Sequence, residues 1–179
     1  MFPYQIGEKM SEKGTEFLKE CIADAILELL REKPLDKITA DDICKRSGVG
    51  RATYFRHFKS KEDAIIFKRR LLWQRYCDRV GIEAYDRFHL ESGLELVNFV
   101  YEIREMTLLL YSTGNKHILT DYFRSLAENE TFSLEERYRQ KFLLFGLFGI
   151  LDTWAQCGFD DPPEKVLDRF YKIIATLDA

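Results

Sequence analysis

Two short helix-forming segments on either side of a glycine constrain the fold of this chain more than any other feature. They lie within residues 38–63, which read ITADDICKRSGVGRATYFRHFKSKED. Thr39 stands before the first segment, residues 40–46, where its hydroxyl can accept amide hydrogens of the first helical turn. Gly48 occupies the turn, where a positive φ is needed, and the second segment covers residues 51–57. Short helices joined in this way predict a helix-turn-helix.

The rest of the chain has the apolar spacing of helices. Apolar residues recur at intervals of three and four, and no segment sustains an alternation of period two, so the sequence predicts an all-α fold. We expect helices at residues 12–32, 61–80, 91–111, 116–128, 133–157 and 163–177. The predicted organisation is a helix-turn-helix domain at residues 12–60, followed by a helical domain at residues 61–179.

Positive charge is concentrated in one segment although the chain is acidic overall. The net charge is -3, yet residues 43–75 contain ten basic residues against two acidic ones, which leaves a local charge of +8. The remaining residues therefore carry -11. A basic segment on an acidic protein is typical of a module that neutralises phosphates, and it is equally typical of a solvated helix face.

The helix-turn-helix residues resemble the DNA-binding region of the TetR family of regulators. That family typically shows I-A-x-x-A-G-V-S-x-x-x-h-Y-x-(H/Y)-F-x-(S/N)-K, and this chain has ICKRSGVGRATYFRHFKSK at residues 43–61. The resemblance covers about residues 15–70 and extends further only in helical layout. It implies a DNA-binding transcriptional regulator from a bacterium, a repressor that binds a near-palindromic double-stranded DNA operator as a homodimer and responds to a small-molecule effector. An activator, or a regulator controlled by a protein partner, is the alternative.

The resemblance also implies particular DNA contacts. Arg51 opens the recognition helix, where its guanidinium can reach a guanine edge, and Tyr54 is placed to touch a phosphate or a thymine methyl group. Thr39 and His57 match phosphate-contacting positions of the family. Lys59 is expected to make a second phosphate contact, and the charge of Lys61 adds to the free amide donors at the start of the next helix. The complete predicted set is Thr39, Gly50, Arg51, Thr53, Tyr54, Arg56, His57, Lys59 and Lys61.

Two positions depart from the family pattern in a way that bears on these contacts. Gly50 stands where the family has a Ser or Thr helix cap, and Phe55 stands where tyrosine is more common. Both departures remove a hydroxyl group. Replacing a hydroxyl cap with glycine costs only a few tenths of a kcal/mol.

The second half of the chain contains apolar residues suited either to a partner or to an ordinary core. Residues 142–151 are apolar all round, and a helix of this kind must be covered on every side. The predicted dimer residues are Phe142, Phe145, Gly146, Gly149, Phe170 and Ile174. The family resemblance implies a ligand pocket, for which the candidates are Phe99, Tyr101, Met106, Tyr111, His117, Tyr122 and Trp154. Plain core packing explains both sets as well.

The sequence offers no pattern for catalysis, for a cofactor or for a metal. The three histidines form no HExxH motif or triad-like set, and neither GxSxG nor the phosphate-binding GxxxxGK[ST] occurs. The four cysteines form no CxxC pair. We therefore expect a protein that is not an enzyme and has no cofactor. With no signal peptide pattern and no apolar run long enough for a bilayer, a cytoplasmic location without membrane contact is expected.

Overall fold

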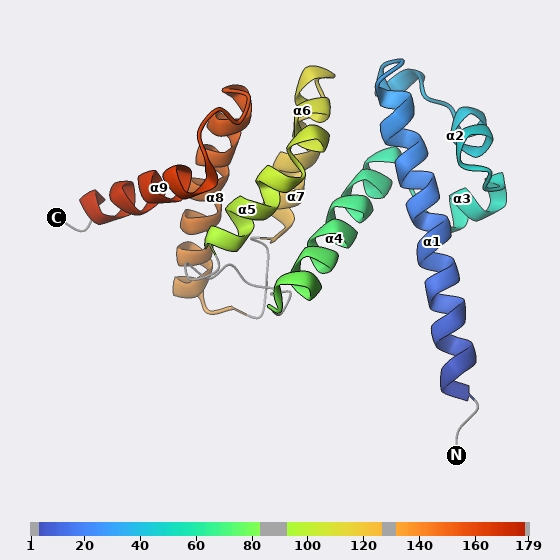
Figure 1. Ribbon diagram of the computed structural model, residues 1–179, viewed down its shortest axis with the longest axis horizontal. Coiled ribbons are helices and arrows are strands. Elements are labelled where there is room, and N and C mark those ends of the chain that lie inside the picture. Colours follow the sequence, from blue (N-terminus) through green and yellow to red (C-terminus); the bar gives the residue numbers. More distant parts are fainter. Residues whose placement is uncertain (1–3, 83–92, 127–131, 178–179) are drawn as a thin grey trace. The chain divides into compact units, whose positions relative to one another are not determined.

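The computed structural model describes residues 4–82, 93–126 and 132–177 as helices joined by turns (Figure 1). The elements are α1 (Tyr4–Leu30), the short 3-10 helix η1 (Leu35–Lys37), α2 (Ala40–Ser47), α3 (Arg51–His57), α4 (Lys61–Val80), α5 (Gly93–Glu102), α6 (Arg104–Ser112), α7 (His117–Leu126), α8 (Leu134–Gln156) and α9 (Pro163–Leu177). No strand occurs in these ranges, and the predicted all-α fold is confirmed.

The chain divides into two compact units, Met1–Gln74 and Arg75–Ala179. The division falls inside α4, whereas the sequence predicted a second domain that begins at residue 61. The first turns of α4 belong to the first unit because Ala64 and Ile65 are fully buried there. In addition, the Lys68 ammonium pairs with carboxylates of α1.

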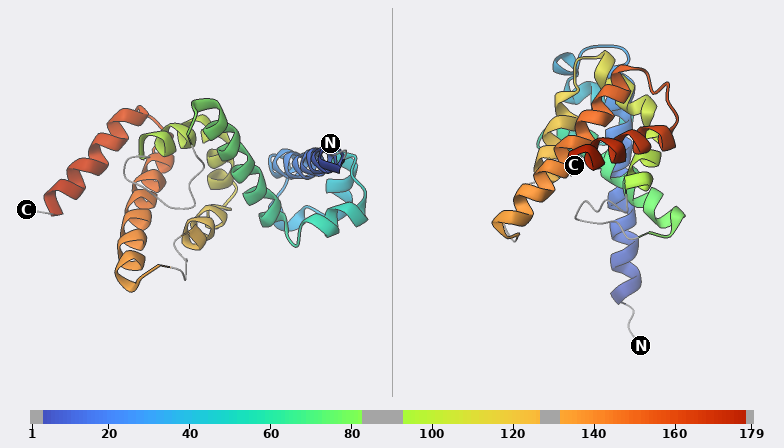
Figure 2. Two further views of the ribbon diagram at one scale, coloured as in Figure 1. Left: turned by 90° about the horizontal axis from the view of Figure 1, so that it is seen from below. Right: turned by 90° about the vertical axis from the view of Figure 1, so that its left-hand side faces the viewer.

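The first unit is a small helical cluster built on α1. Helices α2 and α3 lie beside α1 and beside each other (Figures 1 and 2). Its core includes Ile22 and Ile26 of α1, Ile43 of α2 and Tyr54 of α3, all of which are buried. The helix-turn-helix is therefore held by apolar packing on α1.

The second unit contains a helix break that the sequence analysis missed. A single helix was expected over residues 91–111, but the described part of this range forms α5 and α6, separated at Ile103 with φ -93 and ψ 18. The Arg104 guanidinium donates a hydrogen bond of 3.0 Å to the carbonyl of Tyr101 and lies over the Tyr101 ring. A side chain thus satisfies a backbone acceptor near the break, where the sequence has neither glycine nor proline to mark it.

Helix α8 is the centre of the second unit, since α6, α7 and α9 all pack against it. A tight turn connects α8 to α9, with Gly158 at φ 70 and Phe159 at φ 62. A positive φ is unusual for phenylalanine. The Phe159 ring is buried against Trp154, and the Trp154 Nε1 donates to the carbonyl of Asp161 at 2.9 Å. Packing therefore stabilises this turn from both ends.

Candidate nucleic-acid interface

The turn between α2 and α3 depends on the backbone conformation of Gly48. Its φ of 71 and ψ of 7 are left-handed, as predicted, and its amide donates to the Cys44 carbonyl at 3.0 Å. No atom lies within 4 Å of the position that a Cβ would occupy. The requirement for glycine is therefore conformational and not one of space. Val49 follows directly and is buried, which fixes the start of the second helix.

A reciprocal capping box begins α2. The Asp42 amide donates to Thr39 Oγ1 at 3.2 Å, while the Thr39 amide and hydroxyl donate to Asp42 Oδ2 at 2.8 and 2.7 Å. The Lys33 ammonium lies 2.6 Å from the same carboxylate oxygen. The bond from Lys33 and those from Thr39 hold the pKa of Asp42 well below its usual range. Because the Thr39 hydroxyl proton is already engaged, Thr39 acts first as a helix cap, and a phosphate would have to compete with Asp42 for it.

Helix α3 presents one buried face and one exposed face. Tyr54 is only 6 % exposed, whereas Phe55 is 58 % exposed. Residues one turn apart share a helix face, so Arg51 lies beside Phe55, and Ala52 beside Arg56. All four are exposed, and we call them the α3 reading face. Gly50 has no side-chain cap for α3, as its departure from the family pattern predicted.

Burial changes two of the predicted DNA contacts on α3. The Tyr54 ring belongs to the core, and burial raises the pKa of its hydroxyl, so the contact with a thymine methyl expected of this ring is not available. His57 Nε2 is buried without a hydrogen-bond partner, and burial lowers the pKa of the imidazole. Any phosphate contact from His57 is therefore left to Nδ1. Thr53 is half-buried.

Lys61 has a structural role that the sequence analysis did not foresee. Its ammonium donates to the carbonyl of Leu35 and, at 3.1 Å, to that of Ile38. It thereby fastens the start of α4 to the 3-10 turn that precedes α2. Two of the three ammonium donors of Lys61 thus serve the protein's own backbone, and the predicted phosphate contact at Lys61 stays a prediction. The Lys59 side chain is exposed nearby in sequence and is the better cation for a phosphate.

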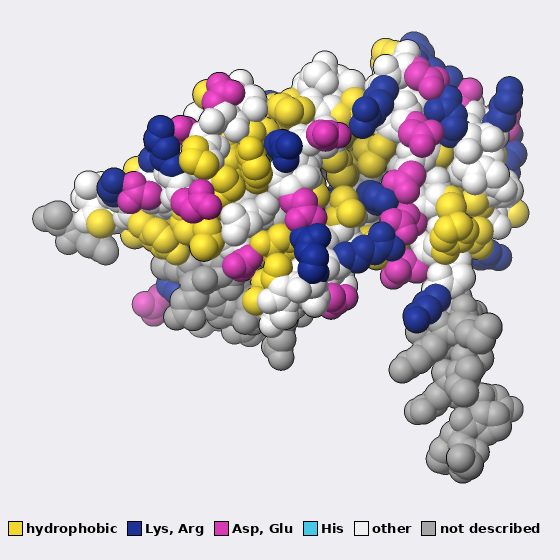
Figure 3. Space-filling model, in the orientation of Figure 1, with side chains coloured by type: hydrophobic (Ala, Val, Ile, Leu, Met, Phe, Trp, Pro, Cys, Tyr) yellow, Lys and Arg dark blue, Asp and Glu magenta, His cyan; other side chains and the backbone are white. Residues whose placement is uncertain are grey.

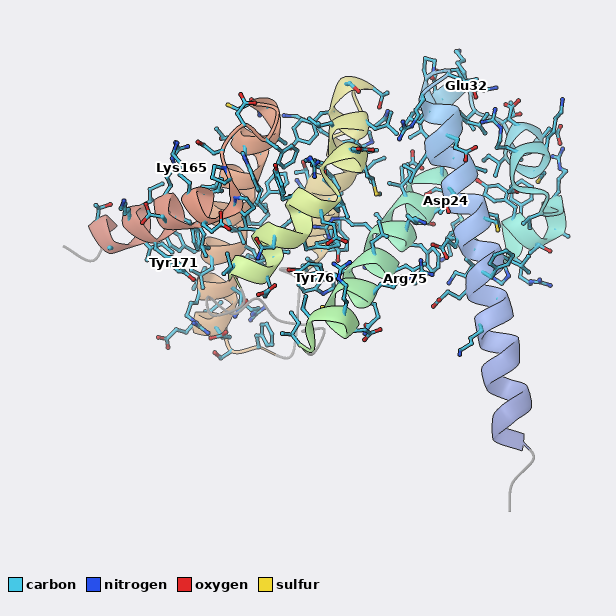
Figure 4. The ribbon with its side chains drawn as sticks, viewed as in Figure 1. Asp24, Glu32, Arg75, Tyr76, Lys165 and Tyr171 are labelled. Atoms are coloured by element: carbon cyan, nitrogen blue, oxygen red, sulfur yellow. The ribbon has the colours of Figure 1, made fainter. Side chains whose placement is uncertain are left out.

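Acidic residues recur at every fourth position along α1 and into the turn that follows it, and they compensate part of the basic segment. We call this set the acidic ladder: Glu16, Glu20, Asp24, Glu28 and Glu32. Figure 3 shows acidic side chains following one another down α1, and Figure 4 labels Asp24 and Glu32. With 3.6 residues per turn, each step of four rotates the ladder by about 40° around the helix.

This rotation carries the ladder from cations of α4 to those of α2. The Lys68 ammonium lies 2.8 Å from Glu20 and 2.7 Å from Asp24. The Arg46 guanidinium lies 3.3 Å from Glu28 and 2.8 Å from Glu32. The +8 of the basic segment therefore overstates the charge offered to a polyanion. It does not account for acids brought close by folding.

The predicted pocket residues of the second unit fall into several clusters. Tyr101 stacks on Trp154 with ring centroids 5.5 Å apart, and Phe99 packs on Tyr76. Tyr122 contacts Phe123. Tyr111 donates to Asp152 at 2.5 Å, and burial together with this bond raises the pKa of its hydroxyl. Met106 is half-buried and His117 is exposed at the start of α7.

The predicted dimer residues divide between surface and core. Phe142 is 60 % exposed and Phe145 is 40 % exposed on α8, with Gly146 and Gly149 also exposed. Ile174 is half-buried. Phe170 is only 3 % exposed, and a Cβ on Gly146 would lie 4.0 Å from its ring. The prediction for Phe170 is thus wrong for a surface contact, since the ring is covered within the chain.

The exposed apolar stripe on α8 is longer than the sequence analysis recognised. Leu134 is 59 % exposed and Tyr138 is 68 % exposed. They precede Phe142 at steps of four, so extending this spacing toward the N-terminus would have found them. We call the four residues the α8 stripe: Leu134, Tyr138, Phe142 and Phe145.

The described residues provide neither a metal site nor a membrane-spanning helix. No group of three or more His, Cys, Asp or Glu side chains in the described ranges is placed to hold a metal ion. Among the helices that the structure describes, none is both long and apolar enough to cross a membrane.

Comparison with known proteins connects this geometry to a family. A family model described as bacterial regulatory proteins, tetR family, matches residues 22–65, which hold the last third of α1, the whole helix-turn-helix and the start of α4. Residues 22–65 are thus similar to the tetR family of bacterial regulatory proteins. The TetR-type match ends within the first unit, so it does not cover the α8 stripe or the aromatic clusters.

One curated relative extends beyond the helix-turn-helix. It is the uncharacterized HTH-type transcriptional regulator YxbF of Bacillus subtilis (strain 168), which is 23% identical over 189 residues, 93% of this chain and 47% of the relative. The chain thus spans about half the length of the curated relative that it matches.

Proposed function

We propose that this protein is a transcriptional regulator that binds double-stranded DNA sequence-specifically, with α3 in the major groove. The α3 reading face carries the proposal, because it offers an exposed guanidinium and an exposed apolar ring beside a rigid, left-handed turn. The Arg51 guanidinium has parallel N–H donors that can bind a guanine edge at two atoms. Arg56 and Lys59 are exposed cations that can bind phosphates. A regulator is favoured over an enzyme because the chain has no recognised catalytic motif.

Selecting bound duplexes from a random pool tests this function directly. The wild-type protein should enrich one near-palindromic sequence and bind it more weakly as salt is raised. Equal binding of the selected duplex and of random DNA would overturn the proposal.

A matched pair of variants then assigns the contact to α3. Arg51→Ala should weaken binding to the selected duplex by about 5- to 150-fold, corresponding to about 1–3 kcal/mol for a bidentate contact. Arg124→Ala is the control, because the Arg124 side chain is 57 % exposed and pairs with Asp121 at 2.8 Å, as Arg51 is 59 % exposed and pairs with Asp41 at 2.6 Å. Equal losses for the two variants would contradict a role for α3.

We also propose that a second copy of the chain covers the α8 stripe. One support is the length of this stripe, and another is the exposure of Gly146 and Gly149, which let another helix approach closely. In addition, a near-palindromic operator has two half-sites, and a dimer supplies one helix-turn-helix for each. The double variant Phe142→Ala, Phe145→Ala should sediment as a monomer at concentrations where the wild type is a dimer. Phe55→Ala, which removes a phenylalanine of similar exposure from the first unit, should stay dimeric. A monomeric wild type at high concentration contradicts the proposal.

The finer regulatory role is proposed from the aromatic clusters of the second unit. We infer a repressor whose affinity for its operator falls when a small molecule binds among these clusters. A reporter gene under the selected sequence distinguishes the signs of regulation, since a repressor lowers expression and an activator raises it. An effect that requires another protein, and persists in Tyr101→Ala and Tyr111→Phe variants, favours control by a protein partner.

A further inference from the structure

Phe55 is an exposed aromatic ring within the proposed DNA-reading surface. Its exposure of 58 % contrasts with 6 % for Tyr54 and 4 % for Phe58, which flank it in the same short segment. Its ring centroid lies 5.0 Å from that of Tyr54, with the planes tilted by 54°. The buried neighbour therefore restrains the orientation of the Phe55 ring before any partner arrives.

The chemistry of this ring limits what it can contact on a duplex. A phenylalanine side chain has no hydrogen-bond donor, so it cannot neutralise or bond to a phosphate. In the major groove, the apolar group that distinguishes one base pair from another is the C5-methyl of thymine. The most favourable contact for an exposed phenyl ring in this groove is therefore with a thymine methyl group.

The neighbours of Phe55 place this contact relative to the rest of the reading face. Arg51 lies one helical turn earlier, with its Nη1 held 2.6 Å from the Asp41 carboxylate. One turn of helix rises about 5.4 Å, whereas successive base pairs rise about 3.4 Å. The two side chains thus reach base pairs that are one or two steps apart.

We propose that Phe55 is a specificity-determining residue that packs on a thymine methyl one or two base pairs from the base contacted by Arg51. This inference rests on the proposed function, because it requires α3 to enter the major groove. It assigns to Phe55 the apolar contact that the sequence analysis gave to Tyr54. It also explains why the loss of a hydroxyl at position 55 is compatible with sequence reading.

Replacing single thymines by uracil removes only the methyl group and tests the contact. The probe is the duplex that the wild-type protein enriches from a random pool. In each version of this duplex, uracil replaces thymine at one position, and the same position is replaced in both half-sites. We expect one position at which uracil weakens wild-type binding about fourfold per half-site, as the burial of one methyl group predicts. Phe55→Ala should bind the thymine duplex correspondingly less well and lose its sensitivity to uracil at that position.

Two further variants identify the side chain that is responsible. Phe55→Tyr keeps the ring and should keep the thymine preference. Ala52→Gly removes the other apolar group of the reading face and should remain sensitive to uracil at the Phe55 position. Selection with Phe55→Ala should still enrich the guanine next to Arg51 while the thymine preference disappears.

The possible outcomes separate this inference from the function on which it rests. A wild-type protein that enriches no sequence defeats the proposed function itself. A wild-type protein that enriches a sequence but loses less than twofold at every uracil position defeats the Phe55 inference alone. So does a Phe55→Ala variant that responds to uracil as the wild type does. The uracil scan of the wild type needs no substitution and remains decisive if a variant folds poorly.

Discussion

The two compact units of this chain differ in how their charged and apolar side chains are covered. In the first unit, charged side chains from α1, α2 and α4 pair with one another around the acidic ladder, and most large apolar residues are buried. In the second unit, α8 leaves four large apolar side chains exposed in a continuous stripe. The difference teaches that the first unit pairs much of its charge within one chain and exposes only a few large apolar side chains, Phe17 and Phe55 above all, whereas the second unit has a longer apolar surface suited to another copy.

The largest expected effect is a difference in the free energy of unfolding between substitutions at a buried and at an exposed position on α8. Leu147 is fully buried, so Leu147→Ala should lower the free energy of unfolding by about 2–5 kcal/mol. Phe142→Ala removes a larger side chain, yet it should change the free energy of unfolding by at most about 0.5 kcal/mol in a dilute sample. Urea unfolding at several protein concentrations measures both.

Protein concentration provides the control for this first prediction. The loss caused by Phe142→Ala should grow as concentration rises, because a dimer adds stability by mass action. The loss caused by Leu147→Ala should be present at every concentration. A concentration-independent loss of several kcal/mol from Phe142→Ala would show that the stripe is covered within one chain.

The second prediction concerns the ion pairs of the first unit. Lys68 is 13 % exposed and bonds to two carboxylates, so Lys68→Met should cost about 1.5–3 kcal/mol, the range of hydrogen bonds to charged groups. Lys165→Met in the second unit is the control, because its pair with Asp161 is half-exposed and pairs of this kind contribute about 0–1 kcal/mol. Thermal and urea unfolding compare the two. Similar losses would remove the contrast in ion pairing between the units.

The third prediction compares a helix cap from each unit. Thr39→Ala should cost about 1 kcal/mol, because it breaks one side of a reciprocal capping box. Ser133→Ala at α8 removes one bond, from the Glu136 amide at 3.2 Å, and should cost less. Thr39→Ser retains the hydroxyl and serves as the matched control for urea unfolding. A larger loss at Ser133 contradicts the greater importance of caps in the first unit.

The smallest effect should be a pH dependence from the same capping box. The pKa of Asp42 is depressed below its ordinary 3.8, chiefly by Lys33 and then by Thr39, so its stabilising contribution is complete above about pH 4. The contribution is lost as the pH falls further toward the folded-state pKa, because protonation then removes the carboxylate. The stability difference between wild type and Asp42→Asn should therefore shrink below pH 4. A difference that is constant from pH 2 to pH 7 would contradict this assignment.

Local sequence signals were sufficient for the frame of the first unit. The Thr39 cap and the turn at Gly48 depend on backbone groups within a few residues, so the sequence predicted both. The return bonds from Thr39 to the Asp42 carboxylate were not predicted. The role of Lys61 could not be predicted, because its carbonyl acceptors are 26 and 23 residues away in the chain. The exposure of Phe55 and the burial of Tyr54 likewise depend on how α3 packs on its neighbours.

The second unit gave weaker local signals. The break at Ile103 has no glycine or proline, and its backbone is satisfied by an arginine side chain whose rotamer the sequence does not specify. Phe170 and Phe142 are both apolar residues at helical spacing. Only the position of α9 against α8 decides that the first is core and the second is surface.

With the proposed function, the acidic ladder should also affect the first encounter with DNA. Glu28 and Glu32 are more than half exposed and should repel a polyanion before any contact forms. The exposed cations near α3 should attract it at the same range, so that an approaching duplex is turned toward α3. The ladder would then act on the rate of association as well as on stability. Its steering should fade when salt shortens the reach of these charges below about 8 Å.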